Sequence, residues 1–238
     1  MVILISLATF IATLGGGMFA LRFRDRLHLV LGFSAGAVIG VAFFDLLPEA
    51  ISLGSGQFST PVITAITALG FTLYLIIDRL ILIHGHDEIS ENTNYRGKIG
   101  AGSLAIHSFL DGLAIGLAFK VSTAVGAIVS VAVLVHDFSD GINTVNLILK
   151  NSGSKAAAFK WLLLDALAPV LGALSTLFFS VSETMLGLIL ALFAGFFLYI
   201  GASDLLPESH HRHPTIWTTI STILGIVVLY TAIRLANL

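Results

Sequence analysis

The sequence contains no cysteine and little charge, and each shortage excludes a class of protein. Without cysteine there is neither a disulfide framework nor a thiolate metal site, so any bound metal must be held by nitrogen and oxygen. Only 11% of the 238 residues are charged, 56% are hydrophobic, and the mean hydropathy is +0.98. So few polar groups could not cover a water-soluble domain, and the composition therefore predicts an integral membrane protein lying in a lipid bilayer.

The formal net charge of -2 is too small to indicate binding to nucleic acid. The first apolar run, 2–21, has no basic stretch before it and no small-residue cleavage site after it. We therefore expect this run to be a retained membrane span rather than a signal peptide.

Long apolar runs divide the chain into eight expected membrane helices. A helix needs about 20 predominantly apolar residues to cross the hydrocarbon core. Eight such runs lie near 2–21, 28–53, 61–83, 99–119, 122–149, 156–180, 184–206 and 214–234. They are continuously apolar, which favours helices over the alternating strands of a barrel. We expect an all-α membrane protein with a single transmembrane domain, 1–238.

Basic residues are distributed unequally between the two sides of this arrangement. Ten of the twelve Lys and Arg residues fall on one side, and only Lys120 and Arg234 fall on the other. Cytoplasmic loops are enriched in Lys and Arg, so the asymmetry places both termini outside the cytoplasm. It also places a histidine-containing loop, 84–98, inside. We expect the cytoplasmic (inner) membrane.

The pentapeptide DLLPE occurs twice, at 45–49 and at 204–208. The second and seventh helices cross the membrane in opposite directions, so the two copies are expected on opposite sides. An inverted-topology repeat has this property and suits alternating access. We therefore expect a 3+2+3 arrangement, in which helices one to three are related to helices six to eight around a central pair.

A histidine followed four residues later by an aspartate occurs in the middle of two successive spans. The two motifs are HSFLDG, which begins at His107, and HDFSDG, which begins at His136. Positions i and i+4 share one helix face, so Asp111 presents with the first histidine and Asp140 with the second. A mid-membrane aspartate costs about 2.5–3.5 kcal/mol on insertion scales, and this cost must be compensated.

Three compensations are open: a structural hydrogen-bond network, a proton relay, or a bound cation. Two matched faces supply more acceptors than donors, which favours a divalent cation. Imidazole mixed with carboxylate and hydroxyl oxygen suits zinc, ferrous iron, manganese or cadmium, and disfavours copper(I). Ser108 and Asp137 directly follow the two histidines and are expected at the flank of this site.

The same two motifs resemble those of a known family. HSFLDG resembles the HNxPEG signature in the fourth helix of the ZIP (Zrt/Irt-like) metal transporters, and HDFSDG resembles its fifth-helix partner. Residues 32–50 and 195–208 look like its second and seventh helices. The resemblance covers essentially the whole chain and is to a divergent prokaryotic-type member. It implies uptake of divalent metal toward the cytoplasm through a site between the fourth and fifth helices, often with two adjacent metal positions.

The chain departs from that pattern in both motifs. Ser108, Leu110 and Asp111 stand where the family usually has Asn, Pro and Glu, and Ser139 and Asp140 replace Pro and Glu. Loss of the prolines removes the kinks that they cause. Each Glu to Asp change shortens the carboxylate arm by one methylene, so the helices must approach more closely or a water must bridge.

The sixth helix departs as well, because Ala168 precedes Pro169 where the family often has Glu. Asp165 lies three residues earlier on nearly the same face. It is interpreted either as a substitute ligand or as a helix-end acid near other polar groups, which leaves a second metal position open.

Further histidines are expected on the cytoplasmic side. His84 and His86 lie in the 84–98 loop, and three more follow the seventh helix, namely His210, His211 and His213. They either hold exiting metal weakly or are simply polar loop residues exposed to water.

The leading hypothesis is a metal transporter without a prosthetic group. The alternatives are an intramembrane metal-dependent hydrolase, because a bound metal can activate water, and a non-transporting metal sensor. The sequence leaves a homodimer open.

Overall fold

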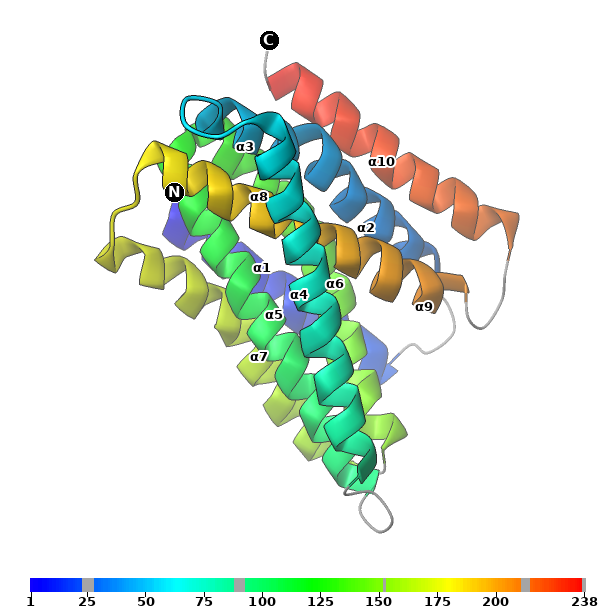
Figure 1. Cartoon of the computed structure of the whole chain (residues 1–238). Coiled ribbons are helices and arrows are strands. Elements are labelled where there is room, and N and C mark those ends of the chain that lie inside the picture. Colours follow the sequence, from blue (N-terminus) through cyan, green and yellow to red (C-terminus); the bar gives the residue numbers. More distant parts are fainter. Residues whose placement is uncertain (23–27, 88–92, 152, 211–214, 237–238) are drawn as a thin grey trace.

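The structure is a computed structural model that describes residues 1–22, 28–87, 93–151, 153–210 and 215–236, and the regular structure in these residues is helical (Figure 1). Among these residues, eight helices are long and apolar enough to cross a membrane. They are Val2–Leu21, His28–Gly54, Thr60–Leu80, Gly97–Val121, Thr123–Leu149, Lys155–Phe178, Glu183–His210 and Ile216–Leu235. The predicted all-α membrane protein with eight spans is confirmed.

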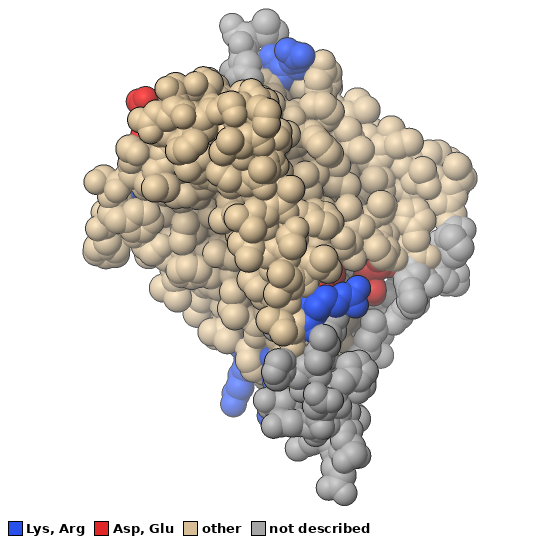
Figure 2. Space-filling view, viewed as in Figure 1, with Lys and Arg blue, Asp and Glu red and all other residues tan. Residues whose placement is uncertain are grey.

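The spans are built from thirteen helical elements. These are α1 (Val2–Arg22), α2 (His28–Val41), η1 (Ala42–Leu46), α3 (Leu47–Gly54), α4 (Thr60–Asp87), α5 (Thr93–Val121), α6 (Thr123–Lys150), α7 (Lys155–Ser175), η2 (Thr176–Phe178), α8 (Glu183–Tyr199), η3 (Ile200–Leu205), α9 (Leu206–His210) and α10 (Ile216–Ala236). On the face drawn in Figure 2, uncharged residues form a broad area, as expected of a surface that faces lipid.

Serines cap the N-termini of α6, α7 and α8. Ser122, Ser154 and Ser182 have extended backbones, and each side-chain oxygen accepts a hydrogen bond from the backbone N–H three residues later. Each cap satisfies a donor that the first helical turn leaves without a partner. The sequence thus starts three of the spans at defined residues.

The expected loop 84–98 is helical throughout its described part, 84–87 and 93–98. α4 continues through His84 and His86 to Asp87, and α5 begins at Thr93. The 28 residues of α4 extend about 42 Å at 1.5 Å per residue, which is longer than a hydrocarbon core of about 30 Å. The helix thus continues past its apolar span, Thr60–Leu80, because polar residues beyond that span can remain helical. Residues 88–92 lie outside the described residues.

The spans pack as two groups. In the first helix group α5 packs against α6 and α7, and α1 packs against α6 and α7. In the second helix group α2 packs against α10, and α4 and α3 pack against α8. α2 also packs against α6 and α4 against α5, which joins the two groups.

Glycines bring four pairs of spans into close contact. Each pair consists of one glycine from each of two helices. Each glycine lies so close to a backbone carbonyl oxygen of the other helix that an added Cβ would collide with this oxygen. The pairs are Gly16 with Gly141, Gly112 with Gly172, Gly36 with Gly225, and Gly70 with Gly195. Each carbonyl belongs to the residue three positions before the partner's glycine. Small residues at such crossings allow membrane helices to approach closely.

Both copies of DLLPE lie where an α-helix widens into a π-helical turn, η1 in one span and η3 in the other. Pro48 and Pro207 have no N–H, which removes the α-helical hydrogen bond to the carbonyl four residues earlier. Such π turns are frequent at functional sites. The two widened turns therefore have the same local cause in the sequence.

Candidate metal centre

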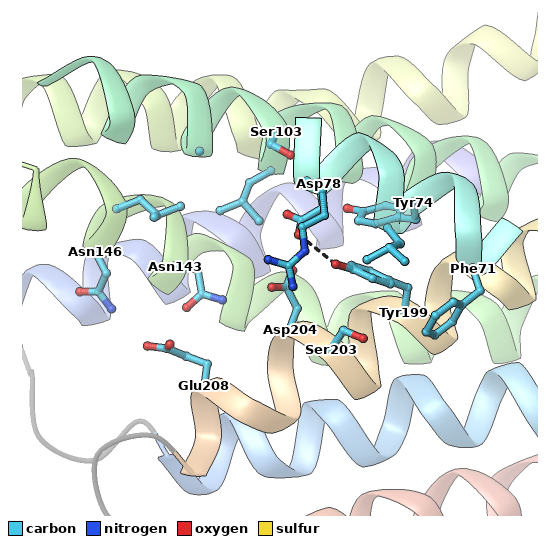
Figure 3. Close-up of a pocket in the computed structure, with 15 residues that line it drawn as sticks. Phe71, Tyr74, Asp78, Ser103, Asn143, Asn146, Tyr199, Ser203, Asp204 and Glu208 are labelled. Carbon is cyan, nitrogen blue, oxygen red and sulfur yellow. Dashed lines mark hydrogen bonds between the residues drawn. The ribbon is translucent and has the colours of Figure 1, made fainter. Parts of the chain in front are cut away.

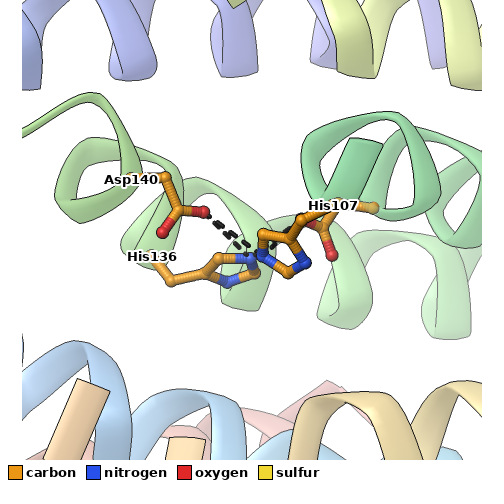
Figure 4. A group of neighbouring side chains, drawn as sticks. His107, His136 and Asp140 are labelled. Carbon is orange, nitrogen blue, oxygen red and sulfur yellow. Dashed lines mark hydrogen bonds and ion pairs between the residues drawn. The ribbon is translucent and has the colours of Figure 1, made fainter. Parts of the chain in front are cut away.

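Two histidines and two aspartates from α5 and α6 meet in the first helix group. His107, Asp111, His136 and Asp140 are all buried, and one ligand atom from each lies within 4.8 Å of the others. Figure 4 shows His107, His136 and Asp140 pointing toward one another. The two His-xxx-Asp motifs, each presented on one helix face, thus form one site.

The spacing of these atoms suits a small cation. Nε2 of His107 lies 3.1 Å from Oδ2 of Asp111 and 3.3 Å from Oδ2 of Asp140. Nε2 of His136 lies 3.2 Å and 3.9 Å from the same two oxygens. A tetrahedral zinc site with bonds of about 2.0 Å has edges of about 3.3 Å between its ligand atoms. Three of these four distances are close to that edge length and the fourth is longer, so the side chains would move inward to hold a tetrahedral ion.

The backbone orients one of the imidazoles. Nδ1 of His136 lies 2.9 Å from the carbonyl oxygen of Ala132. A carbonyl can only accept, so Nδ1 carries the proton, and Nε2 of the neutral ring has its lone pair toward the site. Metal-ligating histidines are commonly fixed by such a bond on the other ring nitrogen.

Aromatic rings from the second helix group cover the cluster. Tyr74 of α4 meets the ring of His107 edge-on, with centroids 5.9 Å apart, and Phe197 of α8 meets His136 in the same way at 5.7 Å. The cluster thus lies at the boundary between the two helix groups. Movement of one group past the other would change what covers it.

Ser108 and Asp165 pair with each other and contribute no atom to the cluster. The Ser108 hydroxyl donates to Oδ1 of Asp165 at 2.7 Å, and Thr144 donates to Oδ2 at 2.7 Å. Asp165 is fully buried inside α7 and is no helix-end acid. Both of its oxygens are occupied, so these neighbours satisfy the carboxylate that the sequence offered as a substitute ligand.

Asp137 has a different environment. It is fully buried, and neither carboxylate oxygen has a hydrogen-bond partner among the described residues. Burial of a carboxylate without a donor is costly unless a cation or proton compensates it. Asp137 is therefore a residue of the predicted site that keeps both carboxylate oxygens available for a cation or a proton.

A cavity of 440 Å³ lies between the two helix groups (Figure 3). Tyr74, which contacts His107, is part of its wall. Its polar lining includes one cation, Arg79, together with Asp78, Ser103, Asn143, Asn146, Asp204 and Glu208. The cavity forms a polar space beside the cluster. From there it extends toward the side of the protein on which α4 ends and α5 begins.

Sequence reasoning did not assign these cavity residues to a site. Asp78 and Asp204 are acids within apolar spans, and that signal would have identified them. Tyr199 lies in the same lining and donates a hydrogen bond to Oδ2 of Asp78 at 2.9 Å. Thr144 and Tyr74 carry no comparable signal in the sequence.

The histidines beyond the spans are only partly described. Nδ1 of His210 lies 3.0 Å from the carbonyl oxygen of Leu206 and 2.9 Å from the hydroxyl of Ser209. His84 and His86 lie in the last turns of α4. His211 and His213 lie outside the described residues.

Comparison with known proteins decides the family. The family model described as ZIP Zinc transporter matches residues 92–230, which include both His-xxx-Asp motifs. The chain belongs to the ZIP zinc transporter family. The family model and the relatives below are named zinc transporters, which is consistent with a transporter rather than an enzyme and does not support the hydrolase hypothesis.

Relatives of this ZIP chain include bacterial and animal proteins. It is 29% identical over 230 residues to the zinc transporter ZupT of Corynebacterium aurimucosum, covering 87% of each chain. It is 26% identical over 220 residues to the zinc transporter ZIP13 of Pongo abelii, covering 86% of this chain and 66% of that protein. A shorter match, 30% identical over 122 residues, is to the zinc transporter foi of Drosophila melanogaster, of which it covers 17%.

Proposed function

We propose that this ZIP chain carries divalent transition-metal cations, zinc above all, toward the cytoplasm by alternating access through the cluster of His107, Asp111, His136 and Asp140. The cluster carries the proposal, because two imidazoles and two carboxylates, all buried and on two apolar spans, each bring one ligand atom within 4.8 Å of the others. With neutral imidazoles and ionised carboxylates, the site has two negative charges, which a divalent cation balances. Iron, manganese and cadmium use similar ligands, and the names of the relatives favour zinc.

Packing symmetry supports alternating access. If the first three spans are exchanged with the last three, and the fourth with the fifth, the four glycine pairs map onto one another. Gly36 precedes Asp45 by nine residues, and Gly195 precedes Asp204 by nine. The repeated pentapeptides thus fall in the same register, as the 3+2+3 inverted repeat requires. Two packings of the helix groups, related by this exchange, would open the site to opposite sides.

The cavity supplies a release route in this proposal. An ion leaving the cluster passes Tyr74 and enters a space lined by Asp78, Asp204 and Glu208. The three carboxylates there outnumber the one cation of the lining, Arg79, so the space favours a cation without the imidazoles that bind it more firmly at the centre. His84 and His86, and the histidines from 210 to 213, would hold the ion weakly beyond it.

A second ion position next to the cluster would use Asp137. Both of its oxygens are available, whereas those of Asp165 accept from hydroxyls. Ser108 would have to rotate away from Asp165 to join such a position. We therefore propose that a second ion binds more weakly than the first.

The orientation in the proposal follows from charge. Ten of twelve Lys and Arg residues lie on the side that the rule assigns to the cytoplasm. Both termini would then lie outside, the cavity would open inside, and the membrane would be the cytoplasmic (inner) one.

Zinc uptake by proteoliposomes tests the function. His107→Ala and Asp111→Asn should each lower the initial uptake rate at least about tenfold, because each removes a ligand or its charge. Glu183→Gln, at the N-terminus of α8 and outside the cluster, is the matched control and should retain the wild-type rate. A cysteine at Ser55, labelled by an impermeant reagent, reports the orientation of the inserted protein.

Two results would overturn the proposal. Zinc binding without uptake by wild-type protein would identify a sensor. Wild-type uptake by the His107→Ala and Asp111→Asn variants would show that the cluster is structural.

A further inference from the structure

A buried serine joins the two helix groups beside the cluster. The Oγ atom of Ser34 on α2 lies 3.0 Å from the carbonyl oxygen of Val135 and 2.9 Å from Oγ of Ser139. Ser34 and Ser139 are both fully buried. Val135 and Ser139 immediately precede the ligands His136 and Asp140 on α6, so this contact grips the helix at the segment that carries half of the cluster.

The direction of the bonds follows from the donors available. A carbonyl oxygen can only accept, so the single hydroxyl proton of Ser34 goes to Val135. The bond between the two hydroxyls is then donated by Ser139. The chain of donors runs from Ser139 to Ser34 to Val135, and both ends are on the same turn of α6. We call these three residues the serine clasp.

The clasp depends on the hydroxyl of Ser139. A residue such as proline has neither a hydroxyl nor an N–H. A proline there would leave the Val135 carbonyl without its α-helical donor. In this chain the helix bond is available and the side chain adds a second tie to α2.

We propose that Ser34 is a positioning residue for transport, holding α6 and its two ligands in register with the second helix group in the conformer whose cavity is open. This inference rests on the proposed alternating access. Interhelical hydrogen bonds inside membranes average about 0.6 kcal/mol, which corresponds to an equilibrium shift of about threefold. Loss of the clasp should therefore change how often each conformer is occupied, while the metal ligands keep their geometry.

The experiment compares Ser34→Ala with Ser130→Ala in full-length protein. Ser130 is the matched control, because it is a buried serine on α6 whose hydroxyl bonds the carbonyl of Gly126 in its own helix. The chain lacks cysteine, so spin labels on Ser55→Cys and Thr123→Cys report the distance between the two groups without background. Zinc affinity at the cluster and the maximal uptake rate are measured on the same variants.

Ser34→Ala should shift the ratio of the two distance populations by about threefold and change the maximal uptake rate, with zinc affinity unchanged. Ser139→Ala should shift the same ratio by less, because Ser34 keeps its bond to Val135. The double variant should match Ser34→Ala, since both substitutions remove the same contact. Should Ser34→Ala fail to fold, Ser139→Ala alone still has to shift the ratio.

Populations and uptake rates equal to those of Ser130→Ala would overturn the proposal. So would a loss of zinc affinity that accounts for the whole change in rate, because the serine would then merely support the ligands. Absence of zinc uptake by wild-type protein is a separate result, and it counts against the proposed function.

Discussion

The two DLLPE segments have the same sequence and the same π-helical turn but different surroundings. Asp45 in the first copy is 6% exposed, and its Oδ2 atom has no hydrogen-bond partner among the described residues. Asp204 in the second copy is exposed and lines the cavity. Since the segments are identical, the helices packed against them must set the difference.

Those neighbours differ in polarity. In the span of the first copy, Gly40 follows the crossing glycine Gly36 by four positions and packs against Leu229. In the span of the second copy, the corresponding residue four positions after Gly195 is Tyr199. Its ring lies 5.2 Å from that of Tyr74, and its hydroxyl is bonded to Asp78. One side is closed by apolar packing, whereas the other has polar groups that water can solvate. The comparison fits a molecule with one side open.

The largest expected effect tests whether the two copies are packed equivalently. Gly36→Ala and Gly195→Ala each place a Cβ against a partner carbonyl oxygen, so each should destabilise the protein by about 1–3 kcal/mol through overpacking. Thermal unfolding in detergent measures this. Gly56→Ala is the control, because nothing lies within 4 Å of a Cβ there. A marked effect at only one of the two crossings would break the equivalence.

A smaller effect is expected from the aspartates themselves. Asp45→Asn removes the charge of a buried carboxylate whose Oδ2 atom has no donor among the described residues, and should raise the free energy of unfolding by about 1 kcal/mol. Asp204→Asn, in the open cavity, should change it by less than about 0.5 kcal/mol. The same unfolding experiment compares the two variants. Destabilisation by Asp45→Asn would mean that the first copy is as well solvated as the second.

The sequence predicted what depends on local pattern. Span number and bounds follow from the length of apolar runs, and the pairing of His107 with Asp111 follows from helical periodicity. The partners of Asp165 and Ser34 could not be predicted, because their contacts join residues 57 and 101 positions apart. The helical extension of α4 into 84–87 was missed, because a change from apolar to polar residues marks the edge of the bilayer and not the end of a helix.

The central claim is that the four-residue cluster holds the transported ion, and zinc X-ray absorption on the purified protein tests it most directly. With one zinc bound, the spectrum should show two imidazole ligands, with nitrogen and oxygen at about 2.0–2.2 Å. His136→Ala should remove one imidazole from that shell. A wild-type spectrum without imidazole, or one that His136→Ala leaves unchanged, would contradict the account.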